Sequence, residues 1–332
     1  MSVLVTGVAG FLGSHVADHL LAAGWEVIGL DDLSGGLLEN VPRAAKFYQG
    51  SILDQDLLRR IFSQHRIEFV YHLAAYAAEG LSHFIRRFNY SNNVIGSMNV
   101  LNDAVRAEVA CLVFTSSIAV YGAADIPMRE DTHPTPEDPY GIAKRAVELD
   151  LMAARRMFGL NYLIFRPHNV YGERQHLGDR YRNVIGIFMN QLLQNQPMTV
   201  FGDGTQTRGF TYVDDVAPLL ARAIDLPETY NQVYNIGADK PITINELAAL
   251  VAEAMGKPCT IRRLPARQEV KHAVADHSRL ARVFGYRAVW ELRDGLRRMA
   301  EWAKSVGSRK PSVFPDVELE KNLPPSWKQP GE

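Results

Sequence analysis

The amino-terminal stretch constrains the fold more than any other part of the chain. Residues 2–6, Ser-Val-Leu-Val-Thr, form a short apolar run, and Gly7-x-x-Gly10-x-x-Gly13 then leads into a helical pattern at 14–23. A strand, a glycine-rich turn and a helix in this order are typical of a phosphate-binding unit. Gly7 permits the tight turn, Gly10 lets the backbone approach a pyrophosphate, and Gly13 brings helix and strand together. Because the helix N-terminus also attracts anions, the stretch predicts a dinucleotide site.

The second apolar run, Trp25 to Leu30, ends in Asp31-Asp32. An acid at the end of the second strand, about twenty residues past the glycines, can accept hydrogen bonds from the ribose hydroxyls of an adenosine. The same charge repels a 2′-phosphate, so Asp31 favours NAD over NADP. The alternative is a strand-end acid that contributes only to solubility.

Strand and helix patterns alternate through the first half of the chain. The further strand candidates are Lys46–Gln49, Phe69–His72, Leu112–Thr115 and Tyr162–Phe165, and helical stretches near 54–64, 83–108 and 141–158 separate them. Alternation of this kind predicts an α/β fold with a right-handed, doubly wound parallel sheet.

Two strand ends carry residues that suit a ligand. His72-Leu-Ala-Ala75 ends one strand with small side chains that let a cofactor pass close by, and His72 itself is expected to be a packed histidine. Phe114-Thr-Ser-Ser117 ends the next strand. Ligands of such sheets bind outside the carboxyl ends of the strands, so the Ser117 hydroxyl can hold a substrate oxygen. A turn or cap role is the alternative for this serine.

Tyr140 and Lys144 are four residues apart in Pro139-Tyr-Gly-Ile-Ala-Lys144, and therefore share one face of a helix. The unperturbed pKa of a phenol is about 10, which makes tyrosine a weak base at neutral pH. A neighbouring ammonium favours the phenolate and lets it accept or return a proton near pH 7. The pair predicts a tyrosine base in a site shared with Ser117, although an ordinary surface pair has the same spacing.

After Arg166 the alternation stops. A polar loop carries His176, Asp179 and Arg182, and a returning strand at 210–213 precedes a helix for which Asp214 and Asp215 are expected as N-caps. The other elements expected here are a helix near 184–195, the strand Met198–Phe201, a strand ending at 234–237, the helix Ile244–Met255 with Thr243 as its cap, and a helix at 291–304. The last stretch, from Lys310 on, carries five prolines and is expected to wrap the surface or to be loose.

Composition excludes several classes of protein. The chain has 332 residues and a net charge of -1, so bulk electrostatics point to neither a nucleic-acid nor a membrane surface. Cys111 and Cys259 both lie in apolar runs and are expected to be buried thiols in a reducing compartment. There is no CxxC or HExxH pattern to indicate a metal site, and no leader or long apolar stretch. We therefore expect a soluble, cytoplasmic protein.

Together these motifs resemble the extended short-chain dehydrogenase/reductase superfamily, and specifically its nucleotide-sugar epimerases and dehydratases. The motifs that carry the resemblance, in order, are Gly7-x-x-Gly10-x-x-Gly13, Asp31, His72-Leu-Ala-Ala75, Asn93, Ser117, Tyr140-x-x-x-Lys144, Arg166-Pro-His-Asn169 and Arg208-Gly-Phe-Thr-Tyr-Val-Asp-Asp215. The resemblance implies an NAD-binding Rossmann domain at 1–167 with returning segments near 209–236. It further implies a smaller nucleotide-sugar-binding domain formed by residues 168–208 and 237–308, with 309–332 as a tail. It also suggests a homodimer built from the helices at 83–108 and 141–158.

The resemblance also implies roles for individual residues. The implied catalytic residues are Ser117, Tyr140 and Lys144. The implied cofactor-binding residues are Gly7, Gly10, Phe11, Leu12, Gly13, Asp31, Ser51, Ile52, Leu73, Ala74, Ala75, Asn93, Tyr140 and Lys144. The implied substrate-binding residues are Ser116, Ser117, Asn169, Asn183, Val184, Phe201, Arg208, Arg267 and Ala273, the last as a gate beside the sugar. Ser51 departs from the pattern, because many relatives carry an acid there that binds adenine.

The residues after Ser117 narrow the reaction that the resemblance implies. The 4,6-dehydratases carry Asp-Glu at these positions, whereas this chain has Ile118-Ala119, and neither side chain can transfer a proton. Oxidation at C4, rotation of the 4-keto sugar and hydride return to its other face need no further acid. We therefore expect an NAD-dependent nucleotide-sugar 4-epimerase, with UDP as the expected nucleotide. A dehydrogenase, reductase or dehydratase of the superfamily is the alternative, and a non-catalytic NAD-binding sensor is the more remote one.

The sugar stays open among a hexose, an N-acetylhexosamine and a uronate. A small residue at Ala273 leaves room for an N-acetyl group, and Arg86 and Arg87 could meet a uronate carboxylate. Solvent-exposed helix arginines are the alternative explanation for the second pair.

Overall fold

The computed structural model describes residues 2–267 and 269–328 and contains a seven-stranded parallel sheet in the order β11-β6-β5-β4-β1-β2-β3. The strands are β1 (Ser2–Thr6), β2 (Glu26–Asp31), β3 (Lys46–Gln49), β4 (Ile67–His72), β5 (Cys111–Thr115), β6 (Tyr162–Pro167) and β11 (Gln232–Ile236). The order reverses between β1 and β4, which leaves a crevice at their carboxyl ends. This confirms the doubly wound α/β fold.

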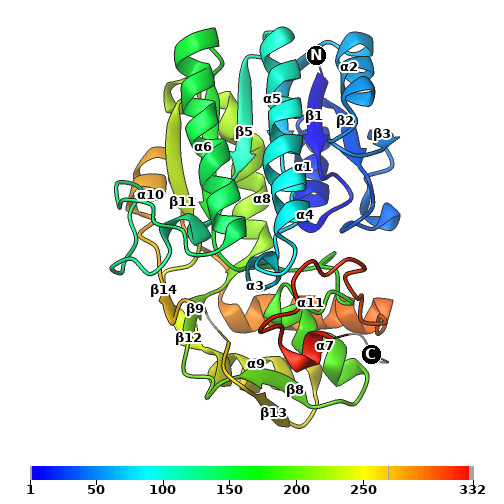
Figure 1. The fold of residues 1–332 in the computed structure, drawn as a ribbon, viewed down its shortest axis with the longest axis vertical. Helices are drawn as coiled ribbons and strands as arrows, with labels where there is room; N and C mark the ends of the chain where they lie inside the picture. Colours follow the sequence, from blue (N-terminus) through cyan, green and yellow to red (C-terminus); the bar gives the residue numbers. More distant parts are fainter. Residues whose placement is uncertain (1, 268, 329–332) are drawn as a thin grey trace.

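Helices cover both faces of this sheet (Figure 1). They are α1 (Phe11–Ala22) and α8 (Val213–Arg222) on one face, and α2 (Gln55–Gln64), α5 (Gly96–Arg106) and α6 (Pro139–Phe158) on the other. The stretch expected as one helix at 83–108 is divided. After α3 (Glu79–Ser82) it comprises α4 (Arg86–Tyr90), a π-helical turn at Ser91–Ile95 and α5.

A second, smaller set of elements lies beyond the carboxyl ends of the sheet (Figure 1). Its helices are α7 (Val184–Leu193), α9 (Ile244–Met255) and α11 (Leu292–Val306), whereas α10 (Ser278–Phe284) packs beside β11 at the edge of the large sheet. Its short strands are β7 (Val170–Tyr171) with β10 (Thr211–Tyr212), β8 (Met198–Phe201) with β13 (Ile261–Leu264), and β9 (Thr207–Gly209) between β12 (Pro241–Thr243) and β14 (His272–Ala273). Among the described residues, none of the helices has the length and apolar character to cross a membrane.

Two expectations about this region are wrong. Asp214 and Asp215 lie inside the first turn of α8, whose N-cap is Tyr212. The Asp215 carboxylate instead accepts hydrogen bonds from the backbone N–H groups of Val289 (2.9 Å) and Trp290 (3.2 Å), which are far away in sequence. Cys111 is buried as expected, but Cys259 is exposed, because it lies in the loop between α9 and β13 rather than in a packed strand.

The described part of the carboxyl-terminal segment, 309–328, packs against the rest of the protein. Phe314, Leu323 and Trp327 are buried in one cluster with Ala78, Leu81, Ile85 and Tyr181. Of the two alternatives for this segment, the structure therefore supports the one in which it wraps the surface.

Candidate functional site

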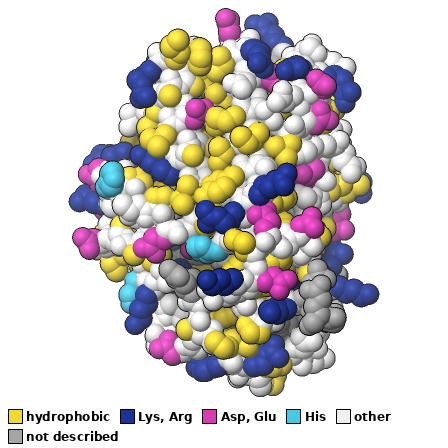
Figure 2. Space-filling view, in the orientation of Figure 1, with side chains coloured by type: hydrophobic (Ala, Val, Ile, Leu, Met, Phe, Trp, Pro, Cys, Tyr) yellow, Lys and Arg dark blue, Asp and Glu magenta, His cyan; other side chains and the backbone are white. Residues whose placement is uncertain are grey.

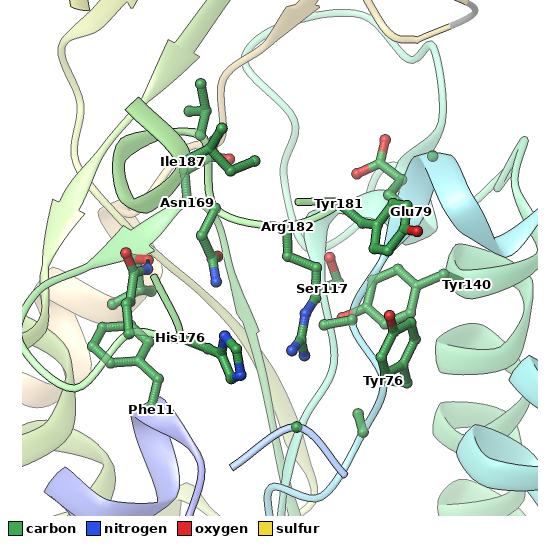
Figure 3. A pocket seen from close by; sticks show the side chains of 18 of the residues that line it. Phe11, Tyr76, Glu79, Ser117, Tyr140, Asn169, His176, Tyr181, Arg182 and Ile187 are labelled. Carbon is green, nitrogen blue, oxygen red and sulfur yellow. Dashed lines mark hydrogen bonds between the residues drawn. The ribbon is translucent and has the colours of Figure 1, made fainter. Parts of the chain in front are cut away.

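A cavity of about 630 Å³ lies between the carboxyl ends of the sheet and the smaller set of elements. Its lining includes the glycine turn, the ends of β4 and β5, the start of α6 and residues of α7, β8 and β9. Figure 3 shows Tyr140, Ser117 and Tyr76 facing Asn169 and His176 across this space. The topological switch point of the sheet is thus the place where the predicted site residues converge.

The glycine turn forms a tight backbone cradle at the start of α1. Gly7 has a positive φ of 75°, and a Cβ on it would lie 2.7 Å from the backbone nitrogen of Ala74. A Cβ on Gly13 would lie 1.9 Å from the carbonyl oxygen of Gly7. Only glycine fits at these two positions, and the N–H groups at the start of α1 face the cavity without partners inside the helix. This cradle fits a pyrophosphate.

Asp31, at the end of β2, lies beside the glycine turn, where the ribose of an adenosine is expected. Its carboxylate accepts hydrogen bonds from the backbone N–H groups of Ala9 (3.0 Å) and Leu33 (2.8 Å). Burial raises the pKa of Asp31, and these hydrogen bonds oppose the rise. Each carboxylate oxygen has a further lone pair, so the fixed carboxylate can accept from ribose hydroxyls as well. The residues present therefore fit NAD.

Tyr140 and Lys144 both reach the cavity from the first turns of α6, which is capped by the Asp138 carboxylate through the Gly141 N–H (2.9 Å). The Lys144 ammonium donates to the carbonyl oxygen of Thr115 at 2.7 Å, and burial lowers the pKa of Lys144 to about 7. Burial raises the pKa of Tyr140, while a hydrogen bond with Ser117 opposes that rise. Burial is therefore the larger influence on the pKa of Tyr140, and Ser117 is the side chain that opposes it most.

Another part of the cavity lining is cationic and aromatic. Arg208 is held by backbone carbonyls, at 2.6 Å from Val270 and 3.0 Å from Lys271, and its guanidinium lies 3.5 Å from the Glu269 carboxylate. Arg267 lies 3.2 Å from the same carboxylate and 4.6 Å from the centre of the Phe201 ring. Forked arginine donors beside an aromatic face suit a nucleoside diphosphate.

Most predicted site residues line the cavity, and Ser51, Asn93 and Ala273 do not. The Asn93 amide holds the loop after β4 instead, because it bonds the backbone N–H (2.9 Å) and C=O (3.1 Å) of Tyr76. Ser51 accepts from the Leu53 N–H at 3.2 Å in a local turn. Ala273 is buried in β14, where it pairs with Arg208, so its position gives no support to a gate beside the sugar.

Other lining residues were not predicted as part of the site. Tyr76 and Arg182 lie in the cavity beside Tyr140 (Figure 3), and Glu79 also belongs to its lining. Arg182 forms an ion pair with Asp179, and its guanidinium carbon lies 4.9 Å from the centre of the Tyr76 ring.

The Ser116 hydroxyl was predicted as part of the site. It is buried without a hydrogen-bond partner among the described residues, as suits a group reserved for a ligand. The polar loop at 176–182 was the available signal for Arg182, whereas no sequence pattern distinguished Glu79.

Comparison with known proteins agrees with this geometry. The model of the NAD dependent epimerase/dehydratase family matches residues 3–237. The UDP-glucose 4-epimerase of Mycolicibacterium smegmatis is 34% identical over 92% of this chain and 99% of its own length. The Thermotoga maritima UDP-glucose 4-epimerase, solved with UDP-glucose, is 36% identical over 92% of this chain and 99% of its own, with a TM-score of 0.87.

A third relative binds a different sugar. The UDP-glucuronic acid 4-epimerase of Bacillus cereus, solved with UDP-glucuronic acid and NAD, is 29% identical over 92% of this chain and 100% of its own, with a TM-score of 0.85. The matching family model, the cradle that fits NAD and the tyrosine, lysine and serine beside it lead to one conclusion. This chain belongs to the NAD dependent epimerase/dehydratase family.

Proposed function

We propose that this protein is a UDP-sugar 4-epimerase that acts preferentially on a neutral UDP-hexose. The observation that carries the proposal is that one cavity is lined by Tyr140 and Ser117 and also by Arg208 and Arg267. A nucleotide sugar bound with its diphosphate at the arginines would present its hexose to the tyrosine hydroxyl.

In the proposed reaction, Tyr140 accepts the proton of the sugar C4 hydroxyl while the hydrogen on C4 leaves as hydride, which creates a 4-keto sugar. Ser117 holds the C4 oxygen as a hydrogen-bond partner throughout. The keto sugar rotates, hydride returns to its other face, and Tyr140 returns the proton to the oxygen. When bound, NAD supplies the hydride acceptor and, through its cationic nicotinamide ring, a field that favours the phenolate.

The surroundings of Ser117 favour this sequence over elimination. Ile118 and Ala119 follow Ser117 in a short 3-10 turn, and the Ser117 hydroxyl accepts from the Ala119 N–H at 3.1 Å. Neither side chain can donate a proton to a leaving C6 hydroxyl. This supports an epimerase over a 4,6-dehydratase.

The choice among sugars rests on Glu79. Glu79 lines the cavity, and desolvation by the protein atoms around its carboxyl, with Asp138 nearby, raises its pKa to about 7 against the opposing charges of Arg208 and Arg267. Above that pH the carboxylate is mostly anionic, and beside a bound sugar it would accept hydrogen bonds from hexose hydroxyls and repel a uronate. Arg86 and Arg87, the residues that could have met a uronate, are exposed and do not line the cavity.

Incubation of the purified protein with UDP-glucose, UDP-N-acetylglucosamine and UDP-glucuronate, without added NAD, tests the proposal. Proton NMR should show inversion at C4, fastest for UDP-glucose. A reductase would need added cofactor, and a dehydratase would give a 4-keto-6-deoxy sugar instead. Failure of all three sugars to invert would refute the epimerase assignment, whereas preference for the uronate would refute only the choice of sugar.

We further propose that the protein forms a homodimer through α5 and α6. Figure 2 shows apolar side chains gathered over the part of the surface where Figure 1 places these helices. The exposed fractions are 41% for Ile142 and 50% for Leu149 on α6, and 53% for Ile95 in the π-helical turn before α5. Light scattering after size exclusion should give twice the chain mass, and Leu149→Glu should shift the mass to that of the monomer.

A further inference from the structure

The carboxyl-terminal segment, residues 309–328, reaches the cavity although no family motif lies in it. The family model ends at residue 237, and each relative described above covers 92% of the chain. Ser326 and Trp327 nevertheless line the cavity together with Phe201 and Arg267. The segment therefore contributes to the site from outside the part of the chain that carries the family's motifs.

Trp327 is the centre of this contribution. Its side chain is 4% exposed, and its ring centroid lies 5.4 Å from that of Tyr181, 6.2 Å from that of Phe201 and 6.3 Å from that of Phe84. Phe84 follows α3 beside the large sheet, whereas Phe201 belongs to β8 in the smaller set of elements. One indole thus bridges both sides of the cavity.

The indole also limits where the Arg267 guanidinium can lie. The Arg267 guanidinium carbon lies 4.6 Å from the centre of the Phe201 ring and 5.8 Å from that of Trp327. A Cβ on Gly80 would lie 3.1 Å from the indole and 3.6 Å from an Arg267 nitrogen. Arg267 is therefore confined between two aromatic rings and the backbone of α3.

Several hydrogen bonds fix the segment in place. The Glu318 carboxylate accepts from the backbone N–H groups of Arg87 (2.7 Å) and Phe88 (2.8 Å) at the start of α4. The Ser312 N–H donates to the Gly178 carbonyl at 2.7 Å, and the Phe314 N–H donates to the Tyr181 hydroxyl at 3.1 Å. Such anchors, spread along the segment, hold it as a wall rather than as a loose tail.

We propose that residues 309–328 form one wall of the UDP compartment, and that Trp327 is a positioning residue that holds Arg267 against Phe201. The inference rests on the proposed function only in taking the ligand's nucleotide to be UDP. It predicts that loss of the indole weakens binding of UDP itself, because Arg267 gains freedom that must be removed on binding. The proposed chemistry at C4 uses Ser117 and Tyr140, which are not among the aromatic and cationic partners of Trp327, and is not altered.

The test compares Trp327→Ala with Trp327→Phe and with Leu319→Ala, a control at a 50% exposed position of the same segment. In Trp327→Ala, calorimetry should show UDP binding weakened about tenfold, the scale of a lost aromatic and cation–π contact. KM for the UDP-sugar should rise in parallel, with kcat within about twofold and bound NAD unchanged. Trp327→Phe should recover most of the affinity, and Leu319→Ala should match the wild type. UDP affinity equal to that of the wild type in Trp327→Ala would overturn the inference.

A measurement on the wild-type protein keeps the proposal testable if the Trp327→Ala variant does not fold. Hydrogen–deuterium exchange with and without UDP should show slower amide exchange in peptides from 309–328 when UDP is bound. Unchanged exchange there, with slower exchange at β8, would overturn the inference. Both experiments use UDP without a sugar, so they remain informative even if no sugar is epimerised.

Discussion

The ammonium nitrogen of Lys144 lies 5.8 Å from the centre of the Tyr140 ring, and it is held there by its 2.7 Å hydrogen bond to the Thr115 carbonyl. The pair is therefore fixed by both α6 and the end of β5. The Tyr140 hydroxyl is hydrogen-bonded to Ser117.

Replacement of Tyr140 by phenylalanine should abolish most of the turnover. The variant keeps the ring but cannot transfer the C4 proton, so kcat should fall by about 10²–10⁴-fold while UDP affinity stays within about threefold. Coupled spectrophotometric assays and calorimetry measure the two quantities. Tyr48→Phe, outside the cavity, is the matched control. Wild-type turnover in Tyr140→Phe would contradict the mechanism.

Replacement of Asp31 by asparagine should weaken NAD binding. The variant loses the anionic acceptor for the ribose hydroxyls, so NAD affinity should fall about tenfold or more, and the preference for NAD over NADP should shrink, because hydrogen bonds to charged groups are the stronger ones. The NAD retained after gel filtration, together with titrations of both cofactors, measures these effects. Asp32→Asn, at the exposed neighbouring position, should have a smaller effect. An unchanged cofactor preference would argue against the role of Asp31.

Glu79 should make the choice of sugar depend on pH. Because the pKa of Glu79 is raised to about 7, its carboxyl is mostly neutral below that pH and anionic above it. The kcat/KM ratio of UDP-glucose to UDP-glucuronate should therefore rise about tenfold from pH 6 to pH 8.5. In Glu79→Gln the ratio should stay flat. A wild-type ratio that does not change with pH would show that Glu79 does not face the sugar.

The buried His72 should lower the folding stability of the protein at acidic pH. Burial lowers the pKa of His72 to about 3, and its ring nitrogens lie 2.7 Å from the Thr6 hydroxyl and 2.8 Å from the Ser97 hydroxyl. As pH falls through about 6.5, the unfolded chain gains a proton that the folded chain does not accept. This histidine alone should therefore remove about 2 kcal/mol of folding stability between pH 8 and pH 5.

Urea unfolding of His72→Asn at several pH values tests this expectation. The variant should be less stable than the wild type at pH 8, because it loses buried hydrogen bonds, and the difference should narrow by about 2 kcal/mol at pH 5. His133→Asn, at an exposed loop position, is the control. A constant difference across this pH range would show that His72 takes up its proton in the folded state.

Local sequence patterns were sufficient for much of the fold and of the cofactor site. The bounds predicted for β1, β3, β8 and α9 match the structure, and Thr243 caps α9 in a capping box with Glu246. Such features depend on periodicity, caps and glycine turns, which operate over a few neighbouring residues. The Tyr140 and Lys144 pair, the glycine cradle and Asp31 were predictable for the same reason.

Contacts between residues far apart in sequence determined the features that local sequence patterns could not predict. The Asp215 carboxylate accepts hydrogen bonds from the backbone N–H groups of Val289 and Trp290 instead of capping α8. The pKa of Glu79 is raised by protein groups that only the fold brings near it. The proline-rich segment has no periodicity of its own, yet it places Trp327 over Arg267 through bonds to residues 87 and 178. A side chain's desolvation and its distant partners exist only in the folded chain. The sequence by itself therefore determined the cofactor cradle and the pairing of Tyr140 with Lys144, and the tertiary structure decided which other side chains enclose the cavity, because only folding brings them together.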